Sequence, residues 1–314
     1  MSDTRPAAGS LSLIMSDSFL SSVGGKVAEQ FVAQLYAPAY VFWTGGVVLY
    51  AHAHWAAVLS LVETLKESEI VVLGAAWLLL VTSSAAIGQR FEPGVIRLLE
   101  GYHWPKRLCE RPKRFFRERY DADETLLQPL APKVNSNTAS AAECQLYVAA
   151  DVRHHWMPPD PEEIMPTQLG NILRASERRI DAKYGLDPRI CWARLWLLIP
   201  NDARDNLSAA RSGLDIGARS FLWGGLFVTW TFWSWWALPV AIVALLASYA
   251  WMVNAAREYG ELLESAFDLF RFALYKSLCL PLPADSTVEP ALGKLLTEFL
   301  WRGNVPAVFK DSGI

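Results

Sequence analysis

Residues 220–256, SFLWGGLFVTWTFWSWWALPVAIVALLASYAWMVNAA, contain no Asp, Glu, Lys or Arg. As one α-helix this run would be roughly 55 Å long at 1.5 Å per residue, far longer than the roughly 30 Å hydrocarbon core of a bilayer. Pro239 is its only proline and follows a cluster of tryptophans. We therefore predict two spans, Ser220–Ala237 and Pro239–Asn254, joined by a tight hairpin. A re-entrant hairpin that does not cross the bilayer is the alternative.

Two further charge-free tracts lie nearer the N-terminus, at residues 30–62 and 70–89. A bilayer span needs about 20 apolar residues. The first tract leaves room for one span and a lead-in, and Pro38 suits the first turn of a helix, so we expect this span at Pro38–Ser60. The tract at 70–89 has the length of one span. The sequence therefore predicts four transmembrane helices in two pairs.

The composition of the whole chain agrees with a membrane protein. Hydrophobic residues make up 52% and charged residues 19% of it, against about 25% charged residues in soluble domains. The mean hydropathy is +0.17. The net charge of −3 gives no reason to expect a nucleic-acid partner. Residues 1–37 do not resemble a signal peptide and are expected to form a leader with an amphipathic lead-in.

Basic residues are concentrated on one side of the four expected spans. The connection at residues 63–69 holds one lysine and three glutamates, and the hairpin at Pro239 is uncharged, whereas the other flanks are basic. Cytoplasmic loops carry the excess of Lys and Arg. We therefore expect an integral protein of a bacterial-type inner (plasma) membrane, with both termini cytoplasmic. The expected order is a leader (1–37), a first transmembrane pair (38–89), a cytoplasmic helical domain with a basic juxtamembrane segment (90–219), a second transmembrane hairpin (220–254) and cytoplasmic amphipathic helices (255–314).

Capping residues predict several helices of the cytoplasmic part. Thr167 is placed to cap the N-terminus of a helix that Gly185 ends. Asp187 opens the next helix, which Pro200 closes. Asn201 begins a third helix, which no proline separates from the expected third span. We therefore expect one long helix that continues into the membrane.

Other segments between and after the spans are less uniform. A short helix is expected after Pro93, an amphipathic helix over 257–278 and a last helix over 290–303. Residues 121–138 are polar and contain prolines, so we expect a loop there. Residues 141–156 fit either a helix or a strand.

A basic segment with interleaved aromatic residues, WPKRLCERPKRFFRERY at 104–120, follows the first transmembrane pair. Its cationic residues are Lys106, Arg107, Arg111, Lys113, Arg114, Arg117 and Arg119. Near a membrane surface each such charge attracts anionic headgroups by about 1 kcal/mol. We predict contact with anionic lipid here. A basic linker that fixes topology and a site for an anionic ligand are the alternatives.

Tryptophans in the apolar tracts are predicted to anchor the spans at the bilayer surface, because the indole ring is apolar and its N–H needs a polar partner. The expected interfacial anchors are Trp55, Trp230, Trp233, Trp235 and Trp236. An aromatic box for a cationic ligand is the alternative for the last four. Glycine pairs allow helices to approach closely. The expected packing positions are Gly45, Gly46, Gly224 and Gly225.

No motif for catalysis, metal or cofactor binding is recognisable. Asp151, His154 and His155 lack metal-ligand spacing and are expected in a polar loop. His52 and His54 are interpreted as interfacial residues. The four cysteines are spaced too widely for a metal or redox motif and are expected to be free thiols. We therefore predict no catalytic residues, no metal and no cofactor.

The sequence thus predicts an all-α, polytopic membrane protein with four transmembrane helices in two pairs and a mainly helical cytoplasmic domain. The favoured function is an oligomeric pore or membrane-acting effector that its cytoplasmic domain gates. A membrane-anchored scaffold that recruits a cytoplasmic partner is the alternative, and a lipid-modifying membrane enzyme is a third. The expected partners are anionic membrane lipids and further copies of the chain, with a cytoplasmic protein as an alternative partner, but not nucleic acid.

Overall fold

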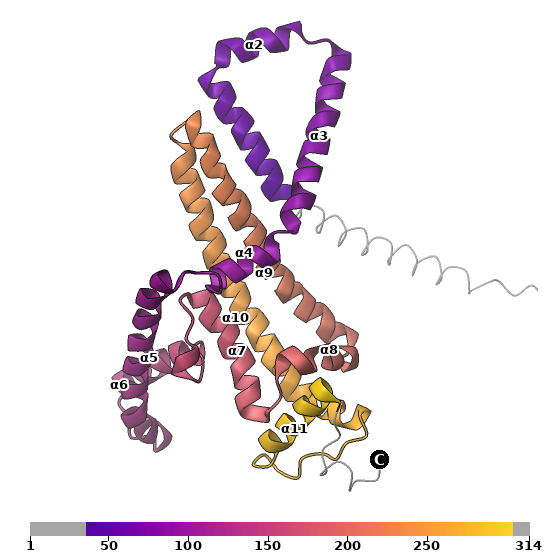
Figure 1. Cartoon of the computed structure of the whole chain (residues 1–314). Coiled ribbons are helices and arrows are strands. Elements are labelled where there is room, and N and C mark those ends of the chain that lie inside the picture. The colour runs from indigo at the N-terminus through magenta and orange to yellow at the C-terminus, as the bar shows by residue number, and fades with distance from the viewer. Residues whose placement is uncertain (1–35, 304–314) are drawn as a thin grey trace, which may run out of the picture. The chain divides into compact units, whose positions relative to one another are not determined.

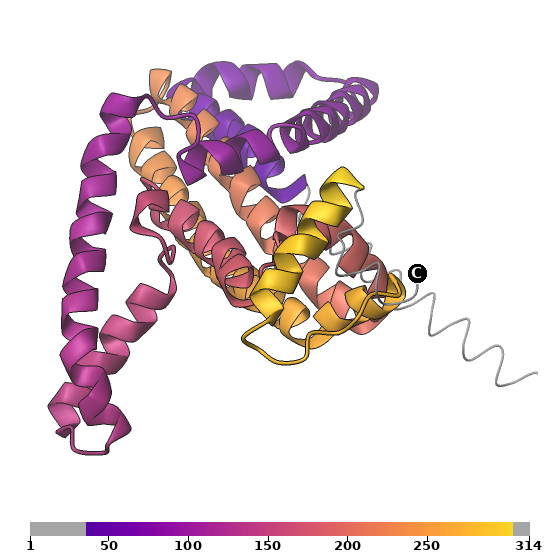
Figure 2. The same cartoon turned by 60° about the horizontal axis from the view of Figure 1, so that its bottom comes forward.

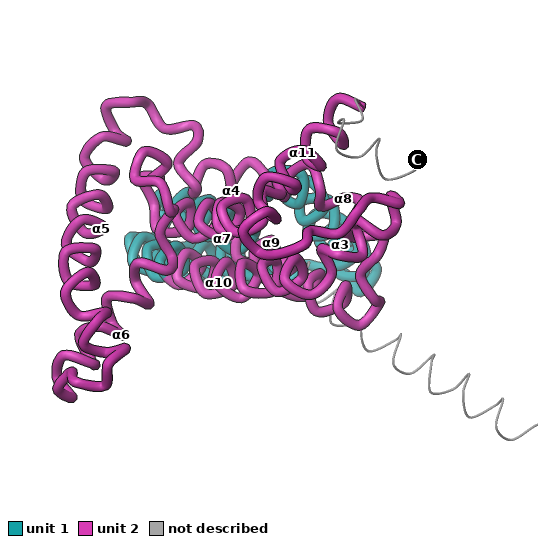
Figure 3. Tube along the Cα trace, turned by 90° about the horizontal axis from the view of Figure 1, so that it is seen from below, with its two compact units in different colours: residues 1–92, 219–246 teal, residues 93–218, 247–314 magenta. Residues whose placement is uncertain are grey.

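The computed structural model describes residues 36–303, and every element among them is helical, so the all-α prediction is confirmed. The chain divides into two compact units (Figure 3). Unit 1 comprises the described residues up to Glu92 together with Arg219–Leu246. Unit 2 comprises Pro93–Ala218 together with the described residues from Ala247 onward. The predicted leader, up to residue 35, and the end of the C-terminal tail, residues 304–314, lie outside the described part of the chain.

Unit 1 is built from apolar helices. Its elements are a helix over residues 36–53, α2 (Trp55–Thr64), α3 (Glu67–Gln89), the C-terminal end of α9 (Asn201–Phe227), the 3-10 helix η2 (Val228–Phe232) and the N-terminal end of α10 (Ala237–Ser277). In Figure 1, α2 bridges the separated ends of the helix over 36–53 and α3. The core contains Phe42, Val81, Trp223 and Phe227. The ring N–H of Trp43 also donates to Ser84 Oγ at 3.0 Å.

Two helices among the described residues, α3 and α10, are long and apolar enough to cross a membrane. Their most apolar stretches are only 11% and 28% buried, respectively. On α3, for example, Val71 is 71% and Leu79 is 67% exposed. The core helix of a soluble protein buries such side chains, whereas these face outward. An exposed apolar surface of this kind supports a membrane location.

The helix expected over Pro38–Ser60 is not continuous, because it is interrupted at His54. The first helix ends at residue 53 and α2 begins at Trp55. The imidazole of His54 stacks on the ring of Tyr50, with centroids 4.6 Å apart, and its Nδ1 lies 3.2 Å from the Tyr50 carbonyl oxygen. That oxygen also accepts the backbone N–H of His54 at 3.0 Å. The side chain and the backbone N–H of His54 thus both contact the Tyr50 carbonyl oxygen at the residue where the helix is interrupted.

The charge-free run 220–256 folds back, but not at the boundaries expected. The α-helical part of the predicted third span ends at Phe227, where α9 ends, and η2 and a turn at 233–236 follow. The prediction of a helix up to Ala237 is therefore wrong, whereas the single long helix from Asn201 across Arg219 is confirmed. α10 begins at Ala237, so that Pro239 lies in its first turn, where a proline costs no hydrogen bond.

The predicted separation between a fourth span ending at Asn254 and an amphipathic helix beginning at Arg257 is also wrong. α10 runs without interruption from Ala237 to Ser277. No proline and no C-capping glycine lies at the expected boundary. The change from apolar to charged residues there is a change of composition within one helix.

Unit 2 contains α4 (Glu92–Glu100), whose first residue belongs to unit 1, and most of the remaining helices. These are α5 (Lys106–Asn135), α6 (Ala141–His155), the 3-10 helix η1 (Pro161–Glu163), α7 (Gln168–Tyr184), α8 (Pro188–Leu198), the N-terminal part of α9, the C-terminal part of α10 and α11 (Glu289–Arg302). The predicted caps are confirmed: Thr167 Oγ1 accepts the N–H of Gly170, Gly185 ends α7 at φ +68°, and Asp187 accepts the N–H of Arg189. Two apolar clusters form the core, one around Phe267 and Tyr275, the other around Leu214 and Met252.

The expected loop at Asp121–Thr138 is largely helical, so that prediction is wrong. α5 continues through Pro112, Pro129 and Pro132 to Asn135. Figure 2 shows α6 packed along α5 as a helical hairpin. Burial of Tyr120 and Leu130 on α5 compensates for the hydrogen bonds that the prolines remove.

The segment Ala141–Trp156, which fitted a helix or a strand, is a helix over Ala141–His155. Ser140 accepts the N–H of Glu143, and the carboxylate of Glu143 accepts the N–H of Ser140 at 2.9 Å. This is a capping box. The sequence Ser-Ala-Ala-Glu at 140–143 was therefore a usable signal for the helix.

Candidate functional site

All seven predicted lipid-contact residues lie on α5, and all seven are exposed. Arg117 is bound within the protein, because its Nη2 donates to the carbonyl oxygen of Pro161 at 2.9 Å and to Glu162 Oε1 at 3.1 Å. Arg119 lines a cavity instead. The other five make no hydrogen bond or ion pair within the described residues. Those five are Lys106, Arg107, Arg111, Lys113 and Arg114. Their contact with lipid stays a prediction.

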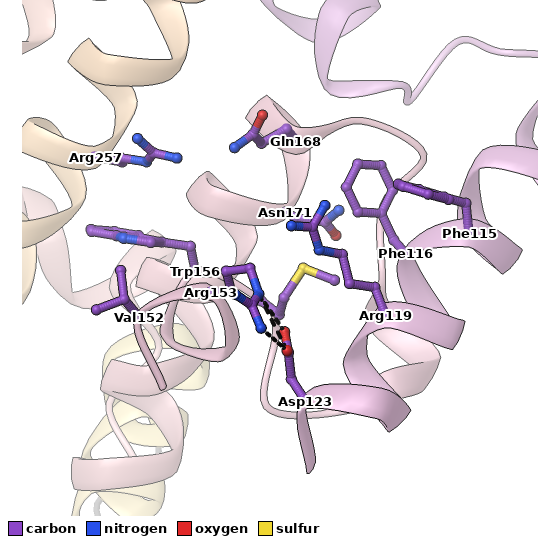
Figure 4. A pocket seen from close by; sticks show the side chains of 11 residues that line it. Phe115, Phe116, Arg119, Asp123, Val152, Arg153, Trp156, Gln168, Asn171 and Arg257 are labelled. Carbon is purple, nitrogen blue, oxygen red and sulfur yellow. Dashed lines mark hydrogen bonds and ion pairs between the residues drawn. The ribbon is translucent and has the colours of Figure 1, made fainter. Parts of the chain in front are cut away.

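The cavity that contains Arg119 has a volume of about 230 Å³ and is formed by α5, α6, α7, α10 and residues just after α6. We call it the arginine cavity. Its lining residues are Phe115, Phe116, Arg119, Asp123, Val152, Arg153, Trp156, Met157, Gln168, Asn171 and Arg257. Figure 4 shows Arg257 and Trp156 on one side of the cavity and Arg119 with the two phenylalanines on the other. The cavity therefore brings together segments that lie far apart in the sequence.

Three guanidinium groups and one carboxylate give the arginine cavity an excess of positive charge. Arg153 is neutralised by Asp123: its Nη2 lies 2.5 Å from Oδ1, and its Nε donates to both carboxylate oxygens at 3.2 Å. Arg119 and Arg257 have no carboxylate partner within the described residues. The Nε of Arg257 is also buried without a hydrogen-bond partner. An unsatisfied buried donor of this kind is costly until an acceptor arrives.

The remaining walls of the arginine cavity are aromatic and amide groups held in place by neighbours. Phe115 and Phe116 pack edge to face, with ring centroids 5.4 Å apart. Trp156 lies under the guanidinium of Arg179 at 5.5 Å. Asn171 Oδ1 accepts the N–H of Met165 at 2.7 Å, and its Nδ2 donates to the Met165 carbonyl oxygen at 3.1 Å. These contacts fix the shape of the cavity before any ligand enters.

This arrangement is suited to binding an organic anion. Two unpaired guanidinium groups supply charge-assisted hydrogen bonds to a phosphate or carboxylate. The phenylalanine and tryptophan rings supply apolar contact for the rest of the ligand. The single carboxylate of the cavity, Asp123, is engaged by Arg153 and is therefore not available as a general base.

The histidines beside the arginine cavity offer no metal site. The ring of His154 packs on Tyr120 with centroids 4.4 Å apart, and burial together with Arg179 lowers the pKa of His155. Both lie on α6, as does Asp151, so this segment is not the polar loop expected. No group of three or more metal-ligating side chains occurs among residues 36–303.

The glycine pairs predicted for helix packing lie in unit 1 against aromatic and small side chains. A Cβ on Gly46 would stand 2.2 Å from the ring of Trp230, and one on Gly45 would stand 2.7 Å from Phe227. A Cβ on Gly224 would stand 3.2 Å from Ala244 Cβ, whereas Gly225 has more space. These positions permit close approach of neighbouring elements in unit 1.

The five predicted interfacial tryptophans fall into two groups. Trp230 packs among Phe42 and Trp43 in the core of unit 1. The other four are exposed, and two of them, Trp235 and Trp236, are stacked with centroids 4.2 Å apart. The remaining two are Trp55 and Trp233. For these four exposed rings a place at the bilayer surface stays a prediction.

Sequence reasoning identified Arg119 but missed Arg153 and Arg257. Arg257 directly follows the charge-free run at 220–256, and no local pattern connects it with α5. Comparison of the chain with protein-family models, with curated proteins and with solved structures gives no match. The assignment of function therefore depends on the geometry of the site.

Proposed function

We propose that this chain is a multi-pass membrane protein whose unit 2 binds an organic anion in the arginine cavity and thereby controls unit 1. Unit 1 acts in this proposal as an oligomeric pore or as a membrane-acting effector. The observation that carries the proposal concerns α10. Arg257 on this helix lines the cavity, and the same helix continues without interruption to Ala237 in the apolar unit.

The packing of α9 and α10 supports such coupling. Both helices contribute residues to both units. In unit 2, a Cβ on Gly213 would stand 3.2 Å from Ala255 Cβ, and one on Gly217 would stand 2.3 Å from Met252 Cγ. Glycine and small side chains let the two helices approach closely, so the part of α10 beside Arg257 is in direct contact with α9. A ligand that displaces Arg257 therefore acts on both helices.

For the membrane part we infer that both charge-free pairs cross the bilayer, with unit 2 and the termini on the cytoplasmic side. The exposed apolar faces of α3 and α10 support the crossing. The basic flanks support the orientation. The α-helical part of α9 after Arg219 is short, and η2 extends it. A 3-10 helix rises about 2 Å per residue, against about 1.5 Å in an α-helix, so η2 spans more of the bilayer per residue.

Reconstitution tests the proposal. Full-length protein in phosphatidylcholine–phosphatidylglycerol liposomes is assayed for ion flux with and without phenyl phosphate, a small aromatic anion. Phenyl phosphate should bind, and Arg257→Gln or Arg119→Gln should weaken it about tenfold or more, because each removes a charge-assisted hydrogen bond. Arg114→Gln, on α5 but outside the cavity, is the matched control and should not change binding. Absence of flux under every condition, together with a monomer in detergent, would exclude the pore.

Recruitment of a cytoplasmic partner is the second candidate, favoured by the α5–α6 hairpin. Leu146 and Val148 on α6 are 56% and 58% exposed, and Leu108 on α5 is 62% exposed. Exposed apolar side chains on a projecting hairpin suit a protein contact. Affinity capture with the wild type and with Val148→Asp tests this role. Failure to recover any stoichiometric partner with the wild type would count against it.

A further inference from the structure

A second cavity in unit 2 lies between α4, α7, α8, α9 and α10 and differs in charge from the arginine cavity. Its volume is about 200 Å³, and Glu100, Glu177, Trp192, Arg211 and Tyr259 are among its lining residues. A groove of about 420 Å³ adjoins it, because Trp192, Arg211 and Tyr259 line both. Nothing in the proposed function uses this pair of spaces, which we call the glutamate cavity and its groove.

The two glutamates of this cavity lack partners although arginines lie nearby. Arg189 is held by Asp187, with Nη2 to Oδ2 at 2.7 Å and Nε to Oδ1 at 3.1 Å. Arg211 lies 3.6 Å from Asp215. Neither Glu100 nor Glu177 has a hydrogen bond or an ion pair to its side chain within the described residues. Two carboxylates therefore face the cavity with their hydrogen-bonding capacity unused.

The walls of the glutamate cavity point independently to a ligand with an apolar part. The ring of Trp192 stacks on the buried ring of Phe267, with centroids 6.1 Å apart, and lies 5.5 Å from the ring of Trp196. Trp196 and Leu207 continue this apolar surface along the groove. The ring of Trp192 suits a cation as well, since an aromatic ring face is the negative end of its quadrupole. The guanidinium of Arg211 already lies over the ring of Tyr259, 5.9 Å from its centroid. A small chamber lined by two glutamates and two arginines, Arg189 and Arg211, thus opens into a larger apolar groove.

We propose that the glutamate cavity and its groove bind an organic amine, with the ammonium group between Glu100 and Glu177 and the apolar part between Trp192, Trp196 and Leu207. A primary ammonium has three N–H donors, which match two carboxylates. The attraction is charge-assisted, and the site is partly desolvated, so the contact is strong. This proposal does not depend on the proposed function, because the two cavities take ligands of opposite charge.

The electrostatics of Glu100 make the proposed binding dependent on pH. Burial and the neighbouring Glu177 raise the pKa of Glu100 to about 7, although Arg211, Arg97 and Arg174 lower it. Burial likewise raises the pKa of Glu177, and Asp187 raises it further. The neighbouring Arg174, Arg189 and Arg178 lower it. Tyr102 and Tyr259 are the other titratable groups here, and burial raises the pKa of both. An ammonium needs the ionised carboxylate, so binding releases a proton from Glu100.

The magnitude of that dependence follows from linkage. With a pKa of about 7, Glu100 is mostly ionised at pH 8 and mostly protonated at pH 6. If binding requires the ionised form, the affinity for an amine falls about tenfold between pH 8 and pH 6. Replacing the carboxylate by the amide in Glu100→Gln should abolish most of this change.

Isothermal titration calorimetry on the full-length protein in detergent tests the proposal with three probes of similar size. These are 2-phenylethylamine, the neutral 2-phenylethanol and the anionic 3-phenylpropionate. We expect the amine to bind at least about tenfold more tightly than the other two, and to lose about tenfold or more in affinity with Glu177→Gln. Glu118→Gln, which neutralises an exposed carboxylate on α5, should leave binding unchanged.

Several results would overturn the proposal. They are an affinity for the alcohol equal to that for the amine, an affinity that does not change between pH 6 and pH 8, or no binding of any probe. The pH series needs only the wild type, so the test stands even if Glu177→Gln does not fold. Amine binding that Glu177→Gln leaves intact in a folded variant would also overturn it.

Discussion

The ion pair between Asp123 on α5 and Arg153 on α6 should control the stability of the helical hairpin that forms one wall of the arginine cavity. The side chain of Asp123 is 5% exposed, and Arg153 contacts both of its oxygens. Removing the cation by Arg153→Met leaves a buried carboxylate without compensation, which costs about 3–5 kcal/mol in well-buried pairs. Since the side chain of Arg153 is 39% exposed, water replaces part of that contact, and we expect about 2–3 kcal/mol.

A double-mutant cycle separates the ion pair from the packing of the methylene groups. Asp123→Asn removes the buried charge, so Arg153→Met should cost less in that background, with a coupling energy of about 1–2 kcal/mol. Hydrogen exchange of the α6 amides measures the result, because the hairpin can open without global unfolding. Lys133→Met provides the control. It breaks an exposed pair with Glu143 on the same hairpin and should change the exchange very little.

Three outcomes would refute this reasoning. If Arg153→Met changes the opening free energy of α6 by less than about 0.5 kcal/mol, Asp123 is solvated in solution and the hairpin is not held by this pair. If Arg153→Met and Lys133→Met have equal effects, burial of Asp123 is not the cause. The additive result in the double mutant would point to packing alone.

Three more predictions concern pH, close packing and thiol reactivity. Glu100 has a pKa of about 7 in the folded protein, against an ordinary value of 4.5, so the folded state holds this proton more tightly than the unfolded state does. The free energy of unfolding therefore falls as the pH rises from about 4.5 to about 7. Glu100→Gln should raise the melting temperature at pH 8 but not at pH 4.5. Gly46→Ala should cost about 1–3 kcal/mol in thermal unfolding, whereas Gly74→Ala, with nothing within 4 Å of the new Cβ, should not destabilise. Burial raises the pKa of Cys191 to about 11, so maleimide should label the exposed Cys279 and spare Cys191 in mass spectrometry of the folded protein.

The helix ends were predictable where one residue supplies the capping interaction. Thr167 and Asp187 accept backbone N–H groups, and Gly303 ends α11 at φ +76°, as its position after the apolar run indicates. α5 was not predictable by the same rules. Pro129 and Pro132 indicate a break locally, and the packing of α5 on α6, a tertiary contact that these rules do not consider, explains why the helix continues.

The site was predictable only in part, for a related reason. The basic segment at 104–120 showed that α5 presents cations, but the sequence does not say which of them find partners. Arg117 is neutralised by Glu162, whereas Arg119 is not. Arg257 reaches the same cavity from α10. Contacts between residues so far apart in the chain depend on the tertiary fold and leave no local pattern.

The charge-free tracts likewise show which residues form the apolar part of the chain, but they do not show where its helices begin and end. In the first tract the break comes at His54, whose imidazole contacts the Tyr50 carbonyl oxygen, and neither a proline nor a glycine marks it. In the last tract the α-helix ends at Phe227, before the tryptophan cluster that begins at Trp230, and Trp230 enters the core where Gly46 leaves room for it. Pro239 does not cause this turn, since it lies inside the first turn of α10. The ring of Trp230 fills the space over Gly46, so Gly46→Ala should disturb unit 1 more than any change at Pro239 that preserves the helix.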